Sequence, residues 1–260
     1  MKVDTGYLYA RDNKRIFVNT CLGCTGQCLY CYLPKYGYDN NLGNQTIKTA
    51  ESLIEEIEGL GVGSDTLITL GCFSECFDEK NKPETLKLIK YFLARGNQVQ
   101  VATKRQVKLD DVQDINDLIQ YQGQFVIFIS SATISKWGKY EKGTDLPEQR
   151  FKSFDISKST DIPTVLYMKP VLKGVTKNDI DLYKEVINRY GVKNVVVGSV
   201  FGENKSNETV HFSDDERLFY NPNEDELEIS KQLMGLGNVR VFSRSSTVMN
   251  FYRKKELERE

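Results

Sequence analysis

The chain of 260 residues carries 35 Lys and Arg against 36 Asp and Glu, a net charge of −1. No overall positive field therefore draws it to nucleic acid, which counts mildly against a DNA partner. No window approaches about eighteen apolar residues, which excludes a membrane-spanning helix, and without signal-peptide features we expect a cytoplasmic protein.

After a short lead-in strand or loop over residues 2–16, the chain alternates strands and helices. The predicted strands cover residues 16–19, 66–70, 98–102, 124–130, 164–168 and 194–198, and the predicted helices cover 46–58, 83–94, 109–119, 147–154 and 177–190. Alternation of this kind predicts an α/β fold with a parallel sheet and helices outside. Right-handed crossovers should curl the sheet into a partial (β/α)6 barrel.

We expect two parts: a barrel domain over residues 1–202 and a C-terminal appendage over residues 203–260 that packs on it. The appendage is acidic near residues 214–216 and 224–226, which repels phosphate. We expect a loop position for His211, a helix over 227–234 and a strand-rich end over 239–251. The basic residues of this end form a small patch that we expect to be solvated and not a nucleic-acid site: Arg240, Arg244, Arg253, Lys254 and Lys255.

Four of the six cysteines fall within eleven positions, which in a chain of this size indicates a metal site and not a disulfide framework. Two pairs, Cys21-x2-Cys24 and Cys28-x2-Cys31, would suit zinc, but structural zinc sites usually separate their pairs by a longer loop. The other spacing, Cys24-x3-Cys28-x2-Cys31, leaves one corner of an iron-sulfur cluster without a protein ligand. We favour the iron-sulfur interpretation and regard Cys21 as structural or spare.

The CxxxCxxC spacing, with Tyr30 before the last cysteine, resembles the signature of radical S-adenosylmethionine (SAM) enzymes. Cys-Leu-Tyr-Cys-Tyr-Leu, in which Tyr30 and Tyr32 flank Cys31, resembles spore photoproduct lyase, a DNA repair enzyme, and its relatives. The resemblance implies the partial barrel of the radical SAM type and a [4Fe-4S] cluster held by Cys24, Cys28 and Cys31. SAM would bind the fourth iron and be cleaved to methionine and a 5'-deoxyadenosyl radical, with electrons from a donor such as flavodoxin or ferredoxin.

Polar residues follow the predicted strands, at the edge where sites in such folds collect. After the second strand, Gly71-Cys-Phe-Ser-Glu75 resembles a segment of the lyases whose cysteine donates a hydrogen atom to the product radical. Cys72 is therefore a candidate hydrogen donor, and Tyr30 and Tyr32 resemble the aromatic pair that assists the return of the radical to SAM. The alternative for Cys72, and for Cys76, is a buried thiol that only packs.

The resemblance also implies three contacts to SAM, one after each of three strands. Lys104 would reach the carboxylate of SAM, Ser74 would bind its amino acid moiety and Ser131 would face it from inside the barrel. The resemblance spans roughly residues 19–200, and it fails in the C-terminal segment. Lys169 stands where we expect an uncharged residue in the lyases, which puts a shared substrate in doubt.

Three classes of function remain open. The first is a lyase-like radical SAM enzyme that acts on a thymine lesion or another nucleotide, with DNA as a potential partner. The second keeps the radical chemistry but directs it at a peptide or a small molecule. The third is a non-catalytic, metal-bound interaction module. We disfavour it, because the polar residues at the ends of the strands would then lie around the barrel mouth only by coincidence.

Overall fold

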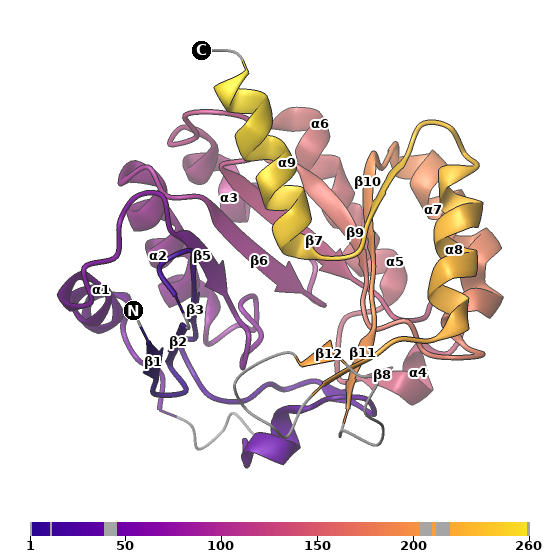
Figure 1. Cartoon of the computed structure of the whole chain (residues 1–260), viewed down its shortest axis with the longest axis horizontal. Coiled ribbons are helices and arrows are strands. Elements are labelled where there is room, and N and C mark those ends of the chain that lie inside the picture. The colour runs from indigo at the N-terminus through magenta and orange to yellow at the C-terminus, as the bar shows by residue number, and fades with distance from the viewer. Residues whose placement is uncertain (1, 11, 39–45, 203–209, 212–218, 259–260) are drawn as a thin grey trace.

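A nine-stranded sheet organises the computed structural model, which describes residues 2–10, 12–38, 46–202, 210–211 and 219–258. In spatial order its strands are β1 (Val3–Asp4), β2 (Leu8–Ala10), β3 (Arg15–Val18), β5 (Leu67–Leu70), β6 (Val99–Thr103), β7 (Phe125–Ser130), β9 (Thr164–Met168), β10 (Asn194–Val197) and β14 (Arg240–Phe242) (Figure 1). The first three pair antiparallel, and every pairing from β3 to β14 is parallel. All six predicted strands are present, and the α/β partial barrel is confirmed.

Helices fill connections between the strands, and one more helix follows the last strand. They are α1 (Ala50–Gly59), α2 (Lys82–Ala94), α3 (Leu109–Asn116), α4 (Trp137–Tyr140), α5 (Pro147–Phe151), α6 (Ile156–Ser159), α7 (Ile180–Tyr190), α8 (Glu224–Met234) and α9 (Ser245–Leu257). The predicted start of the first helix was a few residues early, because Thr49 accepts a hydrogen bond from Ser52 N and caps the helix there. No helix in the described part of the chain has the length and apolar character needed to cross a membrane.

Two small sheets lie beside the main one. A pair consists of β4 (Gln27–Cys28) and β8 (Glu141–Lys142), and a three-stranded sheet consists of β11 (Val200–Gly202), β13 (Phe219–Asn221) and β12 (Val210–His211). The expectation that His211 lies in a loop was wrong, since it belongs to β12. The pairing of β4 with β8 joins the cysteine-rich segment to a strand far away in the sequence.

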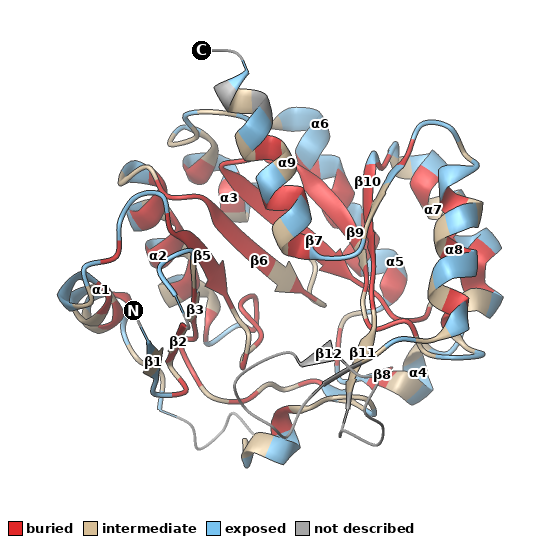
Figure 2. Cartoon of the chain, viewed as in Figure 1, coloured by how far each residue is buried: buried red, intermediate tan, exposed pale blue. Residues whose placement is uncertain are grey.

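The central strands are buried on both faces (Figure 2). One face packs against the surrounding helices in the main apolar core. On the other face, Val126, Val165 and Val196 pack against Val248 and Met249 of α9, which lies across the sheet in Figure 1. A strand-rich C-terminal end was predicted, but only β14 is a strand. The β-branched and aromatic residues after it instead form the apolar side of a helix, since tertiary packing overrides local propensity.

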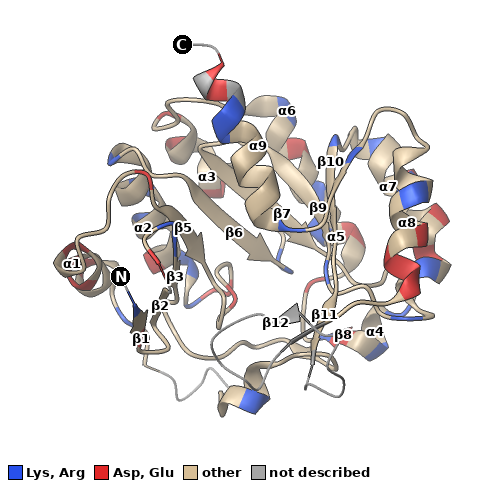
Figure 3. Cartoon of the chain, viewed as in Figure 1, with Lys and Arg blue, Asp and Glu red and all other residues tan. Residues whose placement is uncertain are grey.

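The acidic residues at 224–226 belong to a helix. They form the first turn of α8, where negative charge is favourable beside the positive end of the helix dipole (Figure 3). Asn223 caps the helix by accepting from Asp225 N, and Asp225 itself accepts a hydrogen bond from Gly174 N at 2.7 Å. This part of the acidic appendage therefore stabilises a helix.

Candidate active site

A cavity of about 610 Å³ opens at the carboxyl ends of the parallel strands. Its lining includes residues at the ends of successive strands or shortly after them: Gly71, Cys72, Ser74, Thr103, Lys104, Arg105, Ser130, Lys169, Ser199 and Phe201. The prediction that the polar strand ends gather in one place is thus confirmed. The cysteine-rich segment of residues 21–32, called the cluster segment below, lines the same cavity with Cys24, Cys28, Tyr30, Cys31 and Tyr32.

Two backbone contacts hold the cysteine-rich segment over the strand ends. Gly23 N donates to Phe73 O at 2.8 Å, and Gly23 forms an isolated parallel bridge with Ser74. Further on, β4 pairs with β8 so that Cys28 lies opposite Glu141. The segment is therefore positioned by two distant parts of the chain.

Three thiols of this segment surround a space that suits a cluster. A Cβ atom at Gly26 would stand 3.2 Å from Cys24 Sγ and 3.9 Å from Cys28 Sγ, so the glycine keeps the space between these thiols open. Burial raises the pKa of the Cys28 and Cys31 thiols, so a bound metal would be needed to favour their thiolate forms.

Among the residues that the structure describes, no group of three or more Cys, His, Asp or Glu side chains is arranged to hold a single metal ion. A [4Fe-4S] cluster would be held differently, with each thiolate bound to a different iron.

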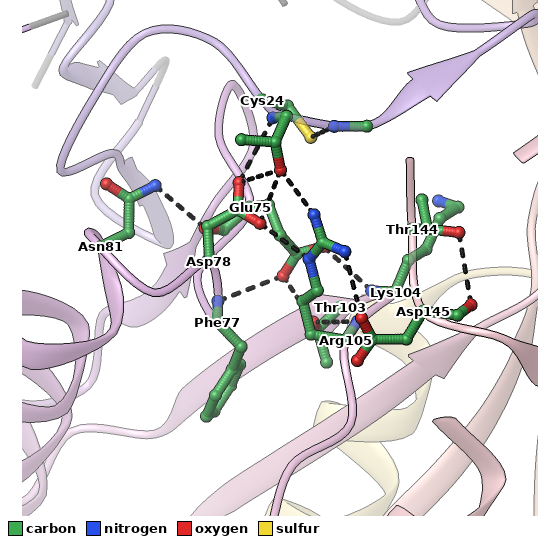
Figure 4. Close-up of polar contacts among 12 residues, drawn as sticks. Cys24, Glu75, Phe77, Asp78, Asn81, Thr103, Lys104, Arg105, Thr144 and Asp145 are labelled. Atoms are coloured by element: carbon green, nitrogen blue, oxygen red, sulfur yellow. Dashed lines mark hydrogen bonds and ion pairs between the residues drawn. The ribbon is translucent and has the colours of Figure 1, made fainter. Parts of the chain in front are cut away.

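Arg105 joins the loops around the cluster segment (Figure 4). Its Nε donates to Asp78 Oδ1 at 2.7 Å, its Nη1 to Asp145 Oδ1 at 3.1 Å and its Nη2 to Thr25 Oγ1. Thr25 Oγ1 also donates to Asp78 at 2.8 Å. Because Thr25 follows Cys24 directly, this network fixes the start of the cluster segment against the loops after β5 and β6.

A second network holds the other end of the cluster segment. Glu141 is fully buried, accepts from Arg150 Nη2 at 2.8 Å and accepts from the Tyr30 hydroxyl. Arg150 is also fully buried, and its Nη1 donates to Ser130 O at 2.6 Å. Tyr30 is thus placed by a buried ion pair beside the last cluster cysteine. Neither member of that pair was identified as a functional candidate from the sequence, although both lie in the stretch whose resemblance to the lyases was noted.

The SAM-binding candidates Ser74 and Lys104 lie on the cavity wall. Ser74 Oγ is buried without a hydrogen-bond partner, so an incoming ligand would satisfy it. Burial lowers the pKa of Lys104, but the nearby Cys28 and Glu141 outweigh burial and the net pKa is raised, so this lysine stays charged. A charged lysine beside an unsatisfied hydroxyl fits the carboxylate and amino groups of SAM.

Glu75 joins these two candidates and was missed as a site residue. It accepts from Lys104 N at 2.9 Å and from the Thr103 hydroxyl, and it also lines the cavity. Burial raises the pKa of its carboxyl group. Its place directly after Ser74 in the segment that resembles the lyases was the available signal.

Cys72 and Tyr32 meet on the cavity wall. The Tyr32 hydroxyl donates to Cys72 O, and its oxygen lies 3.7 Å from Cys72 Sγ. Burial raises the pKa of Cys72 to about 11, so the thiol keeps its proton at neutral pH. A protonated thiol is the form that can give up a hydrogen atom.

Ser131, the third candidate for SAM binding, does not reach the cavity. Ser131 is fully buried behind the wall, where its Oγ lies 3.1 Å from the Tyr183 hydroxyl, and its neighbour Ser130 lines the cavity. Cys21 and Cys76 are buried outside the cavity lining. Asn81 Nδ2 donates to Cys21 Sγ at 3.1 Å, in keeping with a structural place for that thiol.

Comparison with known proteins gives similarity in structure and none in sequence. No family model matches the chain, and no curated protein sequence matches it. A spore photoproduct lyase variant superposes with a TM-score of 0.64 at 12% identity, over 86% of this chain and 75% of the lyase. Another variant, with bound AdoMet and dinucleoside spore photoproduct, gives 0.59 at 14% identity over 85% and 71%.

A third structure, SuiB from Streptococcus suis bound to S-adenosylmethionine, gives a TM-score of 0.57 at 9% identity. The match covers 92% of this chain and 52% of SuiB, so the chain spans about half of that protein. Both kinds of protein share with this chain the parallel barrel. The chain therefore has the partial-barrel fold found in spore photoproduct lyase and SuiB.

Proposed function

We propose that this chain is a radical SAM enzyme of the spore photoproduct lyase-like group, with Cys72 as its hydrogen-atom donor. One observation carries the proposal: Cys72 lies on the wall of the cavity that the three cluster cysteines line, in contact with Tyr32. A thiol at this position would contact a substrate bound in the cavity, which a thiol packed in the core would not.

The residues present fit both cofactors. Cys24, Cys28 and Cys31 would hold three irons of a [4Fe-4S] cluster, while Ser74 and Lys104 would bind the amino acid moiety of SAM. When bound and reduced, the cluster and SAM together supply the 5'-deoxyadenosyl radical that takes a hydrogen atom from the substrate. We expect the electron to come from a small donor protein such as flavodoxin or ferredoxin.

The residues of this chain complete the reaction. The S–H bond of Cys72 breaks homolytically, a C–H bond forms on the substrate radical, and a thiyl radical remains on Cys72. The O–H bond of Tyr32, 3.7 Å away, can then break to restore the S–H bond and leave the unpaired electron on Tyr32. Tyr30, which donates a hydrogen bond to Glu141, lies between Cys28 and Cys31 in the sequence.

The substrate that fits this proposal first is a thymine lesion or another nucleotide. The support is the similarity to a lyase solved with a dinucleoside spore photoproduct. A small molecule or peptide is the second candidate, and Lys169 on the cavity wall favours it, since the lyase resemblance predicts an uncharged residue there.

The experiment is anaerobic reconstitution with iron and sulfide, followed by dithionite and SAM. We expect a brown protein that releases 5'-deoxyadenosine and methionine, both measured by mass spectrometry. A metal-bound interaction module would form neither product. The absence of 5'-deoxyadenosine from a protein with a full iron content would therefore refute the proposal that this chain is a radical SAM enzyme.

The role of Cys72 is tested with a substrate that the enzyme converts, for which lesion-bearing dinucleotides are the first candidates. Thiol hydrogen exchanges with solvent, so turnover in deuterium oxide should place one deuterium in the wild-type product. Cys72→Ala should cleave SAM but yield adducts of the trapped radical. Cys76→Ala, which alters a buried thiol outside the cavity, serves as the control. Normal product from Cys72→Ala would remove this residue from the mechanism.

A further inference from the structure

Gln100 lines the cavity at some distance from the residues that would bind SAM. It belongs to β6, four residues before Lys104, which corresponds to roughly 13 Å of extended strand. Only 3% of the residue is exposed, although its side chain lines the cavity. Since Ser74 and Lys104 would hold the amino acid moiety of SAM near the carboxyl ends of the strands, Gln100 is left for a different ligand group.

One atom of the Gln100 side chain lacks a hydrogen bond. Its Nε2 donates to Ser245 Oγ at 3.2 Å, and this bond fixes the orientation of the amide. Among the residues that the structure describes, none bonds to its Oε1. A buried amide oxygen without a partner is costly, so folded proteins retain few of them. An N–H or O–H group of a ligand would satisfy it.

The cavity wall holds a second unsatisfied atom, on the side where SAM is expected. Of the buried side-chain atoms that have no partner among the described residues, only Ser74 Oγ and Gln100 Oε1 belong to residues that line the cavity. The hydroxyl of Ser74 lies where the resemblance to the lyases implies the amino acid moiety of SAM. The amide oxygen of Gln100 therefore marks a second binding position, which the substrate would occupy.

Gln98, two positions earlier in the chain, shows how a buried amide is satisfied outside the cavity. Alternate residues of a strand lie on the same face, so the two glutamines share a face of the sheet. Gln98 Nε2 donates to Gly123 O and to Met249 O, both at 3.3 Å, and the described residues leave no buried polar side-chain atom of Gln98 unsatisfied. The open acceptor of Gln100 thus goes with its place in the cavity.

The surroundings of Gln100 favour a flat and neutral group. Phe128 of β7 and Tyr167 of β9 line the cavity and pack edge to face, with ring centroids 5.4 Å apart. Phe128 lies two residues beyond Val126, which pairs with Gln100 in the sheet. Rings of this kind exclude water, which strengthens a hydrogen bond made beside them, and they make the burial of a charge costly.

The strand register relates Gln100 to the hydrogen donor. Thr69 of β5 lies opposite Gln100, and Cys72 follows Thr69 by three positions toward the carboxyl end of the sheet. Cys72 and Gln100 both line the cavity. A ligand anchored at Gln100 would therefore extend toward Cys72 and the cluster segment.

We propose that Gln100 is a specificity-determining residue, whose Oε1 accepts a hydrogen bond from a neutral, planar substrate group that carries an N–H or O–H. Ser245 holds the amide in place for this contact. The inference rests on the proposed function and narrows its substrate class, since a ring amide, an imide or a phenol fits the position. The same group methylated on its nitrogen or oxygen would leave Oε1 buried without a partner and would be rejected.

The test is a ligand-observed NMR titration of the protein with cluster and SAM bound, without reductant so that SAM stays intact. The probes are three matched pairs: uracil and 1,3-dimethyluracil, benzamide and N,N-dimethylbenzamide, and phenol and anisole. We expect at least one donor to bind about tenfold or more tightly than its methylated partner, because only the donor satisfies Oε1. The pair that discriminates identifies the group as an imide, an amide or a hydroxyl.

Variants locate the preference at this side chain. Gln100→Met removes the amide at similar volume and should bind both members of each pair alike, whereas Gln100→Glu keeps an acceptor oxygen and should retain the preference. Gln98→Met makes the same change on the same strand outside the cavity, and it should prefer donors like wild type. Ser245→Ala removes only the anchor of the amide and should weaken the preference, so it tests the site even where Gln100→Met fails to fold.

Equal affinities within every pair, the binding of no donor, or a preference that persists in Gln100→Met would overturn the inference. So would tighter binding of the methylated probes, which would show that the amide donates to the ligand and does not accept. Wild-type SAM cleavage is measured separately. If it is present without a preference for donors, only the role of Gln100 is refuted, and if it is absent while the preference is found, only the radical function is refuted.

Discussion

The fold brings the side chains of Cys72 and Tyr32 into contact. Forty positions separate them in the sequence, yet their sulfur and oxygen atoms lie 3.7 Å apart. Burial raises the pKa of Cys72 to about 11, so its hydrogen is retained at neutral pH until a radical takes it. The two residues provide a protonated thiol and a neighbouring phenol at a single point of the cavity.

The cluster ligands can be separated from the other cysteines by substitution. We expect Cys24→Ala, Cys28→Ala and Cys31→Ala each to lose the cluster, because each removes one of only three protein ligands. Cys21→Ala and Cys76→Ala should keep it, since these thiols lie outside the cavity lining. Iron content and visible absorption after anaerobic reconstitution measure the difference. Full iron in Cys24→Ala together with none in Cys21→Ala would contradict this ligand set.

Lys104 is expected to bind the carboxylate of SAM. Lys104→Met should weaken SAM binding by about 1.5–3 kcal/mol, the range for a hydrogen bond to a charged group. Titration calorimetry of the reconstituted protein measures the affinity. Lys108→Met changes an exposed lysine outside the cavity and is the matched control. An unchanged affinity in Lys104→Met would mean that the end of β6 does not contact SAM.

At the scale of elements, the pairing of β4 with β8 determines where the cluster segment lies. Glu141 sits opposite Cys28 in that pairing and forms a fully buried ion pair with Arg150 of α5. The pair bonds to the Tyr30 hydroxyl on one side and to Ser130 O on the other. One ion pair therefore connects the cluster segment, a helix and the end of β7.

Breaking this ion pair should be costly. Arg150→Met leaves Glu141 buried without its partner, so we expect a loss of about 3–5 kcal/mol in the free energy of unfolding. Denaturant unfolding measures that loss, and iron content should fall with it because Tyr30 and Cys28 lose their support. Lys158→Met breaks an exposed pair with Asp155 and should change stability little. Equal stability of the two variants would show that the buried pair contributes nothing.

At the scale of the whole molecule, α9 fills the part of the barrel interior that the cavity leaves. Val248 and Met249 are fully buried against the inner face of the sheet, and the start of the same helix lines the cavity. Gly123, with φ of +88°, lies where any side chain would collide with the Tyr252 ring. The last helix thus completes the core and forms part of the cavity wall.

Packing of α9 should therefore contribute to the stability of the chain. Met249→Ala should lower the free energy of unfolding by about 2–5 kcal/mol, since it leaves a cavity in the inner core. Asn250→Ala, its exposed neighbour on the same helix, should change it little. Denaturant unfolding measures both. A Met249→Ala protein as stable as wild type would show that α9 does not depend on this contact.

The sequence by itself determined the features that depend on neighbours along the chain. Strand and helix alternation predicted the barrel, because hydrophobic periodicity is local, and the spacing of Cys24, Cys28 and Cys31 predicted one metal site. The rule that parallel strands end at one edge predicted that Cys72, Ser74 and Lys104 would gather.

Only the tertiary structure decided which distant side chains meet. The pairs Tyr32 with Cys72, Glu141 with Arg150 and Arg105 with Thr25 join elements whose separation leaves no periodic signal. A strand-rich end was predicted over 239–251, the second half of which belongs to the helix of residues 245–257, because its β-branched and aromatic residues suit either structure. Burial against the inner face of the sheet selected the helix, and its start brought Arg244 to the cavity that Lys169 also lines. Contacts made across a folded core are absent from any local pattern.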